Sequence, residues 1–286
     1  MRRNLLMLAL PLAVGLSACG GGAPTRAAFA FKADAGCAPM GLGGLEGITK
    51  PADHPQLATG AGTLLRAVDA QLTQLRTLDQ PGGDAKVQVE GLMGAMGSLS
   101  QSTRALQQGA SAKDDAAVSR ALNDTTSRYQ DASSKATEIG MTSCVLGMKS
   151  TVDQLSVGSK EIVKSSYLTK GDALCDAAGK KLEALPEPSS SKGLPAVGRY
   201  FDLGLPILTK MVVDLKALTP PPGDEATVAD IIAAQDAGIA KIKEFRDAAI
   251  ANDARKVLAL EKEFDSSLSL ADAKLVSYGF KTCGNI

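Results

Sequence analysis

The residues that could do chemistry in this 286-residue chain are five cysteines, one histidine and a few neighbouring carboxylates. Cys19 ends the stretch LSAC, in which an aliphatic residue and two small residues precede a cysteine. This is the pattern of a bacterial lipobox, where the small residues fit a narrow protease cleft and the thiol takes the lipid. Arg2, Arg3 and the apolar run 5–16 precede it, as in a signal peptide, and that run is too short to span a bilayer. We expect a lipid on Cys19 that anchors the chain to a membrane. The alternative is an ordinary secretory signal with an incidental cysteine.

The other four cysteines, Cys37, Cys144, Cys175 and Cys283, are an even number in a chain expected outside the cytoplasm, which favours disulfides. Cys37 and Cys144 lie 107 positions apart, and Cys175 and Cys283 lie 108 positions apart. Motifs repeat in the same order with offsets of 137 to 140: FKADAGC with TKGDALC, QLRTLDQPGGD with DLKALTPPPGD, and IGMTSC with YGFKTC. We predict a tandem duplication of one domain of roughly 110 residues. Each copy would close its own disulfide, Cys37–Cys144 and Cys175–Cys283.

The histidine and the acids have weaker patterns. His54 lies among prolines in the stretch KPADHPQ. A ligand or general base would need a positioned partner, and we interpret His54 as a solvated loop residue. The adjacent acids at 114–115 and at 224–225 are predicted to be helix caps. Asp34 and Asp172 each precede a cysteine by three residues; we interpret them as caps too, with a role as buried carboxylates as the alternative.

The sequence contains no other motif for catalysis or cofactor binding. The cysteines are too far apart for a zinc site, and the motifs of haem attachment, di-iron, EF-hand, nucleotide-binding and nucleophile-elbow sites are missing. The formal net charge is zero and there is no basic run, which argues against nucleic acid as a partner. The lack of Trp weakens any surface for stacking sugars or bases. We therefore predict a chain with no catalytic residues, no metal and no cofactor.

Apolar residues recur with the 3.6-residue period of a helix along most of the chain. One apolar stripe runs from Leu57 to Leu78, and the same stripe returns 140 positions later, from Val197 to Leu218. Two further stripes follow in each copy, separated by polar breaks. Predicted helix boundaries are the N-caps Asp84, Asp114, Asp224 and Asp253 and the terminating Gly140 and Gly279. We predict an all-α fold of two tandem up-and-down bundles, each with three long helices and one short helix and each closed by one disulfide.

The predicted organisation follows from these patterns. Residues 145–166, rich in Ser, Gly and Lys, join the copies either as a linker helix or as an ordered loop. Pro39 and several glycines weaken the short first helix of the first copy, so we expect that segment to be partly irregular. The predicted parts are a lipoprotein signal peptide (1–18), a lipidated flexible tether (19–30), bundle repeat 1 (31–144), the linker (145–166) and bundle repeat 2 (167–286).

The repeated landmarks resemble those of a known group of proteins. The chain resembles uncharacterised secreted and lipid-anchored helical proteins of high-GC Gram-positive bacteria in four motifs. These are, in order, aromatic-x-x-K-x-D-A-x-C, L-E-A-L-P-x-P, L-x-x-L-x-P-P-x-x-D and a final G-aromatic-x-x-C. The first copy departs from the pattern, with Met141 for the second aromatic residue and Gly36 in the place of Leu174. The resemblance covers both copies, and because its motifs are structural it implies no activity. The residues that carry it are Tyr167, Lys170, Asp172, Ala173, Cys175, Pro186, Pro188, Pro221, Asp224, Gly279, Phe280 and Cys283.

These observations favour a protein on the outer face of the cytoplasmic membrane, held there by lipid on Cys19. The expected function is a non-catalytic binding or scaffolding role in the cell envelope, with an envelope protein as partner. The alternative is a carrier of a small apolar ligand within or between the helical bundles. Small residues in the helices would leave room for such a ligand, although close helix packing is the interpretation that we favour for them. These residues are Gly94, Gly97, Gly204 and Gly238.

Overall fold

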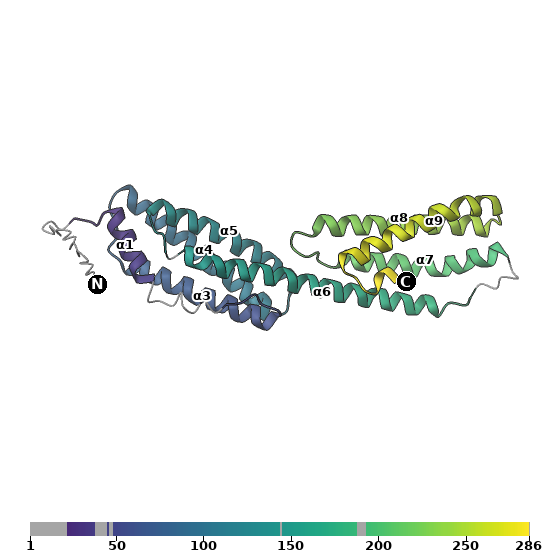
Figure 1. Cartoon of the computed structure of the whole chain (residues 1–286), viewed down its shortest axis with the longest axis horizontal. Coiled ribbons are helices and arrows are strands. Elements are labelled where there is room, and N and C mark those ends of the chain that lie inside the picture. Colours follow the sequence, from purple (N-terminus) through teal and green to yellow (C-terminus); the bar gives the residue numbers. More distant parts are fainter. Residues whose placement is uncertain (1–21, 38–44, 46–47, 144, 188–192, 286) are drawn as a thin grey trace, which may run out of the picture.

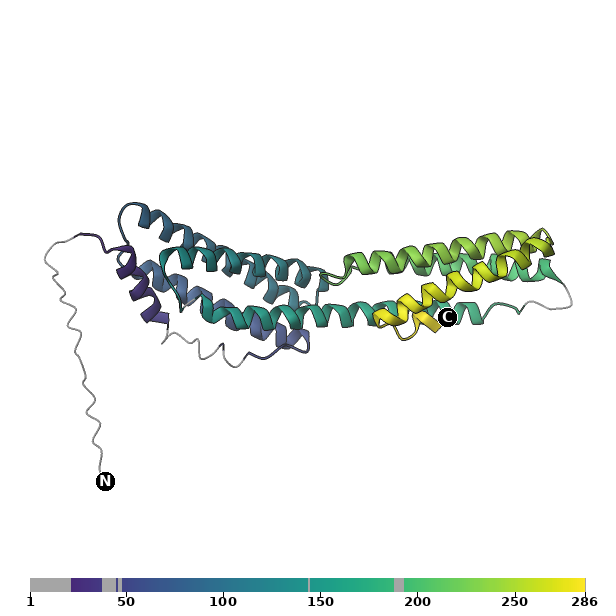
Figure 2. The same cartoon turned by 45° about the horizontal axis from the view of Figure 1, so that its top comes forward.

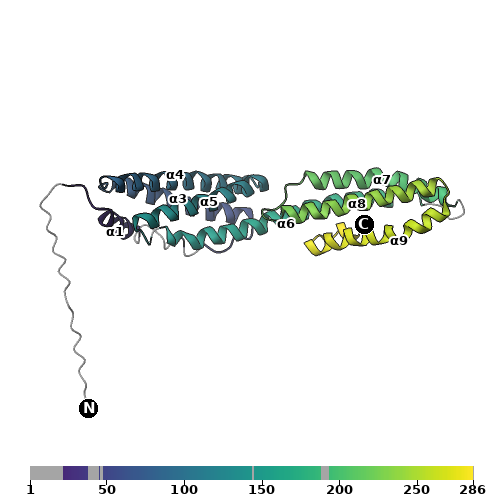
Figure 3. The ribbon, with the colours of Figure 1, turned by 90° about the horizontal axis from the view of Figure 1, so that it is seen from above.

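The computed structural model describes residues 22–37, 45, 48–143, 145–187 and 193–285. The described chain is helical, which confirms the predicted all-α class, and its helices form an elongated rod (Figure 1). The helices are α1 (Arg26–Cys37), α3 (His54–Thr77), α4 (Asp84–Ser111), α5 (Asp115–Ile139), α6 (Lys149–Glu183), α7 (Leu194–Ala217), α8 (Glu225–Ile250) and α9 (Ala254–Tyr278), with the short 3-10 helices η1 (Leu146–Met148) and η3 (Cys283–Asn285). Figures 2 and 3 show α3, α4 and α5 together at one end of the rod and α7, α8 and α9 at the other.

Local sequence explains where several helices begin and end. The side chains of Asp114 and Asp253 accept hydrogen bonds from backbone N–H groups in the first turns of α5 and α9, as predicted for N-caps. Both helices end at a glycine in a positive-φ conformation that residues with a side chain rarely adopt, Gly140 at 94° and Gly279 at 120°. The N-cap prediction for Asp84 is wrong, because Asp84 is the first residue of α4 itself and the preceding glycine is the cap.

Helix α6 is 35 residues long and contributes to both ends of the rod (Figure 1). Of the two alternatives for residues 145–166, the structure has a helix, which begins at Lys149 and continues without a break into the predicted first helix of the second copy. Val152, Leu155 and Val163 from this segment are buried in the same core as residues of α3, α4 and α5. The segment is therefore a packed helix of the N-terminal end rather than a free connector.

The buried apolar residues form separate cores on either side of one point in α6. The largest cluster contains residues between Phe29 and Val163, and the other clusters contain residues between Tyr167 and Cys283. We refer to the described residues up to Val163 as the N-terminal half and to those that follow as the C-terminal half. Each half has its own apolar interior, and α6 supplies one helix to both.

A carboxylate near the start of each half holds the end of that half in the same way. Asp34 of α1 accepts hydrogen bonds from the backbone N–H groups of residues 142 and 143, at 2.8 and 3.1 Å. Asp172 of α6 accepts hydrogen bonds from the backbone N–H groups of residues 281–283, at 2.8 to 3.3 Å. The interpretation of both acids as helix caps is therefore wrong. Each lies within a helix and binds the segment that follows the last helix of its half.

In the C-terminal half this carboxylate lies beside a disulfide. Cys175 and Cys283 are bonded, as predicted, with their Cα atoms 5.0 Å apart. Cys37 ends α1, but its side chain and the whole of Cys144 lie outside the described residues, so the Cys37–Cys144 bond stays a prediction. Cys19 also lies outside the described residues, and its lipidation stays a prediction as well.

Replacing Asp172 with alanine should lower the free energy of unfolding by about 2 kcal/mol, because several backbone N–H groups lose a charged acceptor. Chemical denaturation measures this loss. The matched control is Asp176→Ala on the same helix, which removes only an exposed pair with Lys180 and should cost less than about 0.5 kcal/mol. Equal effects of the two substitutions would contradict the role assigned to Asp172.

Candidate functional site

The two halves fill their interiors to different degrees. Of the twelve largest fully buried side chains among the described residues, eleven lie in the N-terminal half, and the C-terminal half contributes only Leu215. Native cores are normally packed as densely as organic crystals. The helices of the C-terminal half are of similar length, so their interior holds space that side chains do not fill.

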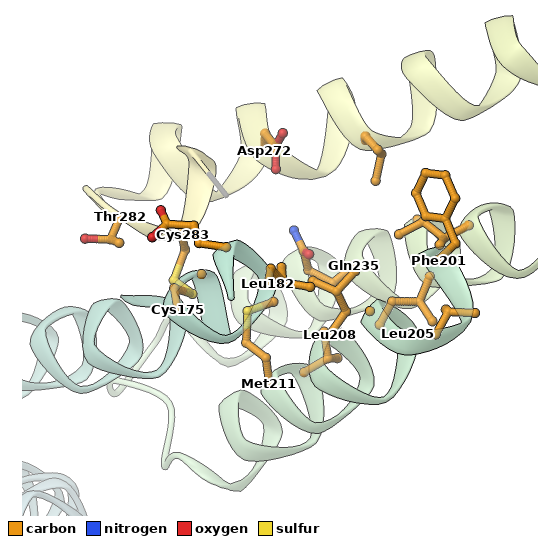
Figure 4. Close-up of a pocket in the computed structure, with 18 of the residues that line it drawn as sticks. Cys175, Leu182, Phe201, Leu205, Leu208, Met211, Gln235, Asp272, Thr282 and Cys283 are labelled. Carbon is orange, nitrogen blue, oxygen red and sulfur yellow. A yellow bond between two sulfur atoms is a disulfide. The ribbon is translucent and has the colours of Figure 1, made fainter. Parts of the chain in front are cut away.

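This space is a cavity of about 530 Å³ between α6, α7, α8 and α9 (Figure 4). Its wall is largely apolar, with Leu205, Leu208 and Met211 of α7 among the residues that line it. The Cys175–Cys283 disulfide lies at one end of the cavity and Phe201 lies near the other (Figure 4). A cavity of this volume and composition is typical of sites that hold a small, mostly apolar molecule.

Three positions of the cavity wall differ from the positions 139 or 140 residues earlier in the N-terminal half. At each of these positions the N-terminal half has a large, fully buried side chain, and the C-terminal half has a glycine or a polar residue that lines the cavity. The pairs are Leu64 with Gly204, at an offset of 140, and Met96 with Gln235 and Leu99 with Gly238, at an offset of 139. The offset of 139 also pairs Lys113 with Asn252, which share an unusual positive φ of 54° and 56° just after the paired helices α4 and α8. Glycine in place of leucine removes side-chain volume at two of these positions. At the third, Gln235 is about as large as methionine and places a polar group in the wall.

The four glycines noted in the sequence therefore differ in role. Gly94 and Gly97 face no atom within 4 Å of an added Cβ, so close packing is the wrong interpretation for them. An added Cβ at Gly204 would lie 3.3 Å from a side-chain carbon of Leu182, and one at Gly238 would lie 3.4 Å from a side-chain carbon of Leu268. No backbone approaches either residue that closely. Gly204 and Gly238 line the cavity, each in close contact with one leucine side chain, so close packing describes them only on that side.

Two polar side chains face the cavity from opposite helices. The Nε2 atom of Gln235 on α8 is excluded from solvent and has no hydrogen-bond partner among the described residues. Its amide nitrogen points toward α9, where Asp272 lies on the facing side of the cavity (Figure 4). Burial raises the pKa of Asp272 above its ordinary value, because no neighbouring cation offsets the loss of solvent. An unpartnered buried donor costs about 1–3 kcal/mol, so a bound acceptor at this point would be stabilised.

A second polar cluster joins the two halves. The Asp115 carboxylate is bound by Ser166 Oγ and Lys170 Nζ of α6, each at 2.6 Å, and lies 3.1 Å from His54 Nε2. The interpretation of His54 as a solvated loop residue is wrong, since it is the first residue of α3 and its side chain is only 15% exposed. Asp115 does not cap α5; that role belongs to the residue before it. Because Ser166 contacts the carboxylate rather than the imidazole, this arrangement is a structural clasp and not a catalytic triad.

The clasp has a consequence for stability at low pH. Burial alone would raise the pKa of Asp115, but the hydrogen bonds from Lys170 and Ser166 and the positive charges of Lys170 and His54 outweigh it and hold the pKa below its ordinary value. The clasp therefore contributes stability at neutral pH, and this contribution is lost as the pH falls below about 4 and Asp115 takes up a proton.

We expect Asp115→Asn to lower the free energy of unfolding by about 2 kcal/mol at pH 7 and by much less at pH 3, measured by urea denaturation at both values. Asp131→Asn on the same helix is the control, because its carboxylate makes only an exposed pair with Lys135. A loss at pH 3 as large as that at pH 7 would refute the assignment.

Asp224 makes a further contact across the helices. It occupies the N-cap position of α8 but makes no capping hydrogen bond, which corrects the prediction for its side chain. Its carboxylate instead accepts a hydrogen bond from the hydroxyl of Tyr278 at 2.7 Å and lies 3.3 Å from Lys164 Nζ. Burial and the charge of Asp224 raise the pKa of Tyr278, so the phenol stays protonated and keeps its donor role.

Sequence reasoning named Gly204 and Gly238 as cavity residues only in the alternative that it did not favour, and it missed Gln235 and Asp272. A signal for Gln235 was present, because it interrupts the apolar stripe of its helix, whereas the residue 139 positions earlier is Met96. Within the described ranges, no three or more His, Cys, Asp or Glu side chains are grouped so that they could bind a metal ion. None of the described helices is both long and apolar enough to cross a membrane.

The chain matches no protein-family model, and searches of curated proteins and of solved structures return no match. The functional argument therefore depends on the residues and geometry described above.

Proposed function

We propose that the chain is a lipid-anchored, extracytoplasmic binding protein that holds a small, largely apolar ligand in the cavity of its C-terminal half. The unpartnered, solvent-excluded Nε2 atom of Gln235 in the wall of a largely apolar cavity is the observation that carries this proposal. A packed core would fill this position with an apolar side chain, as the N-terminal half does with Met96. The signal-peptide pattern of residues 1–18 and the LSAC motif that ends at Cys19 support the location.

Binding is favoured over catalysis by the chemistry of the cavity wall. The described residues that line it include no histidine and no serine, and the only carboxylate paired with a lysine there is Asp176, which binds Lys180 at 2.6 Å near the end of α6. Gln235 and Asp272 lie on opposite helices as separate hydrogen-bonding groups. Polar groups arranged in this way orient a ligand but do not form a nucleophile and base.

Native mass spectrometry of the processed protein, purified gently from its own membranes, tests the proposal. The expected result is a reproducible additional mass of a few hundred daltons, beyond the lipid on Cys19, that is released on unfolding. A protein that carries no additional mass, and that also takes up no apolar probe when one is added, would overturn it.

A second candidate function is attachment of a partner protein of the cell envelope. Helices α7 and α8 form a groove in which the half-exposed Val213 and Pro206 lie among charged side chains. An apolar strip with a charged rim is typical of protein-binding surfaces. Cross-linking in intact cells, with a photoreactive residue placed at Val213, would identify a partner, and an absence of specific adducts would remove this candidate.

We also propose that the two halves are copies of one disulfide-closed helical domain. Two observations support this proposal. Asp34 and Asp172 make equivalent contacts with the backbone at the end of their halves. Lys113 and Asn252, which follow α4 and α8, share an unusual positive φ. Non-reducing peptide mapping should then find Cys37 joined to Cys144 in addition to the bond between Cys175 and Cys283. A peptide that joins Cys144 to Cys175 would contradict the tandem arrangement.

A further inference from the structure

The polar groups of the cavity restrict the chemistry of the ligand. Gln235 presents an unpartnered donor, and Asp272 presents a carboxylate for which the described residues provide no cation. The two side chains face each other from α8 and α9 (Figure 4). A single ligand group that accepts from one and donates to the other would satisfy both.

The charges around the cavity disfavour an anionic ligand. Three acids, Asp176, Glu183 and Asp272, and one lysine, Lys180, line it, and the lysine is already held by Asp176 at 2.6 Å. A carboxylate brought next to Asp272 would meet a like charge in an environment of low polarity, where repulsion is stronger than in water. An ammonium group would satisfy Asp272, but it has no acceptor to offer the Gln235 donor.

The polar pair belongs to the C-terminal half alone. The corresponding residues of the first copy, at an offset of 139, are Met96, which is fully buried, and Ser133. Because the first copy folds around an apolar side chain at the first of these positions, the fold itself does not require a polar group there. The pair is therefore an addition to the second copy at the same place where the cavity has opened.

We propose, building on the proposed function, that the ligand is an apolar molecule whose polar end is an uncharged group that both accepts and donates a hydrogen bond, a hydroxyl being the simplest. Its hydroxyl oxygen accepts from Gln235 Nε2 and its hydrogen is donated to the Asp272 carboxylate. Because Nε2 has almost no accessible area in the structure, this contact requires the Gln235 amide to rotate toward the cavity. The apolar body then lies along the wall formed by α7, away from the polar pair (Figure 4).

Three probes with the same apolar chain test the proposal: dodecanol, dodecylamine and dodecanoate. Each is titrated separately into the full chain, and the bound fraction is read by native mass spectrometry. Dodecanol should bind at least tenfold more tightly than dodecanoate and more tightly than dodecylamine. Dodecanoate or dodecylamine binding as tightly as dodecanol would overturn the assignment of a hydroxyl.

Variants of the polar pair sharpen the test. Asp272→Asn should raise the affinity for dodecanoate at least tenfold and change that for dodecanol less than threefold, because the charge is removed while an acceptor remains. Gln235→Met, which installs the residue of the first copy, should lower dodecanol affinity about tenfold. Asp236→Asn is the control, because its carboxylate is half-exposed and pairs with Lys216 outside the cavity. Unchanged probe preference in Asp272→Asn would also overturn the assignment.

The two proposals fail in distinguishable ways. If none of the probes binds, the proposed ligand-binding function itself fails. If all three bind equally and neither variant alters the order, the cavity binds apolar molecules as proposed, and only the inference about the hydroxyl is wrong.

Discussion

Replacing Cys175 and Cys283 together with alanine is expected to lower the free energy of unfolding by about 3 kcal/mol and the unfolding temperature by roughly 6–12 °C. The bond closes a loop with a sequence separation of 108, and the entropy of the unfolded chain rises when so long a loop is opened. Both cysteines are buried, and alanine avoids placing a hydroxyl in their apolar surroundings. Differential scanning calorimetry of the full chain measures the change.

The same variant separates the two halves experimentally. Because the disulfide ties α6 to the segment after α9, hydrogen exchange should increase in α7, α8 and α9 and stay unchanged in α3, α4 and α5, whose core is separate. An equal increase in both halves would show that they unfold as one unit. An unfolding temperature within about 1 °C of the original would contradict the stabilising role of the bond.

The all-α class and several helix ends were predictable because they depend on local sequence. The 3.6-residue apolar period, the capping Asp114 and Asp253, and the terminating Gly140 and Gly279 act within one or two helical turns. Asp84 was mispredicted because a glycine beside it took the cap position. Whether residues 145–166 form a helix could not be decided locally, because burial of Val152 and Leu155 against distant helices stabilises that segment.

The site was less predictable because it depends on contacts between distant residues. Asp115 resembles an ordinary helix cap in sequence, and only the folded chain brings His54, Ser166 and Lys170 to it. Gly204 and Gly238 were visible as small residues, yet a glycine in a helix can mean either close packing or empty space. Comparison of the two halves helps to distinguish these meanings, because Leu64 and Leu99, 140 and 139 positions before the glycines, are fully buried.

Replacing Gly204 with leucine, the residue that lies 140 positions earlier in the N-terminal half, is expected to abolish ligand retention. Its side chain would extend into the cavity past Leu182, which an added Cβ approaches to 3.3 Å and which must shift slightly. Removal of a glycine from the interior of a helix stabilises that helix by about 1 kcal/mol. The leucine side chain also fills empty space between the helices. The additional mass detected by native mass spectrometry should therefore disappear, while the unfolding temperature of the ligand-free protein stays the same or rises.

The matched control is Gly94→Leu in α4, where an added Cβ meets no atom within 4 Å and the residue is exposed. It provides the same gain in helix propensity and should leave ligand retention unchanged. A Gly204→Leu variant that is folded, as judged by its calorimetric transition, and still carries the ligand would show that the molecule binds elsewhere. Loss of the ligand with stability retained would instead mean that the fold tolerates a leucine at position 204. The glycine would then be required for ligand binding and not for folding.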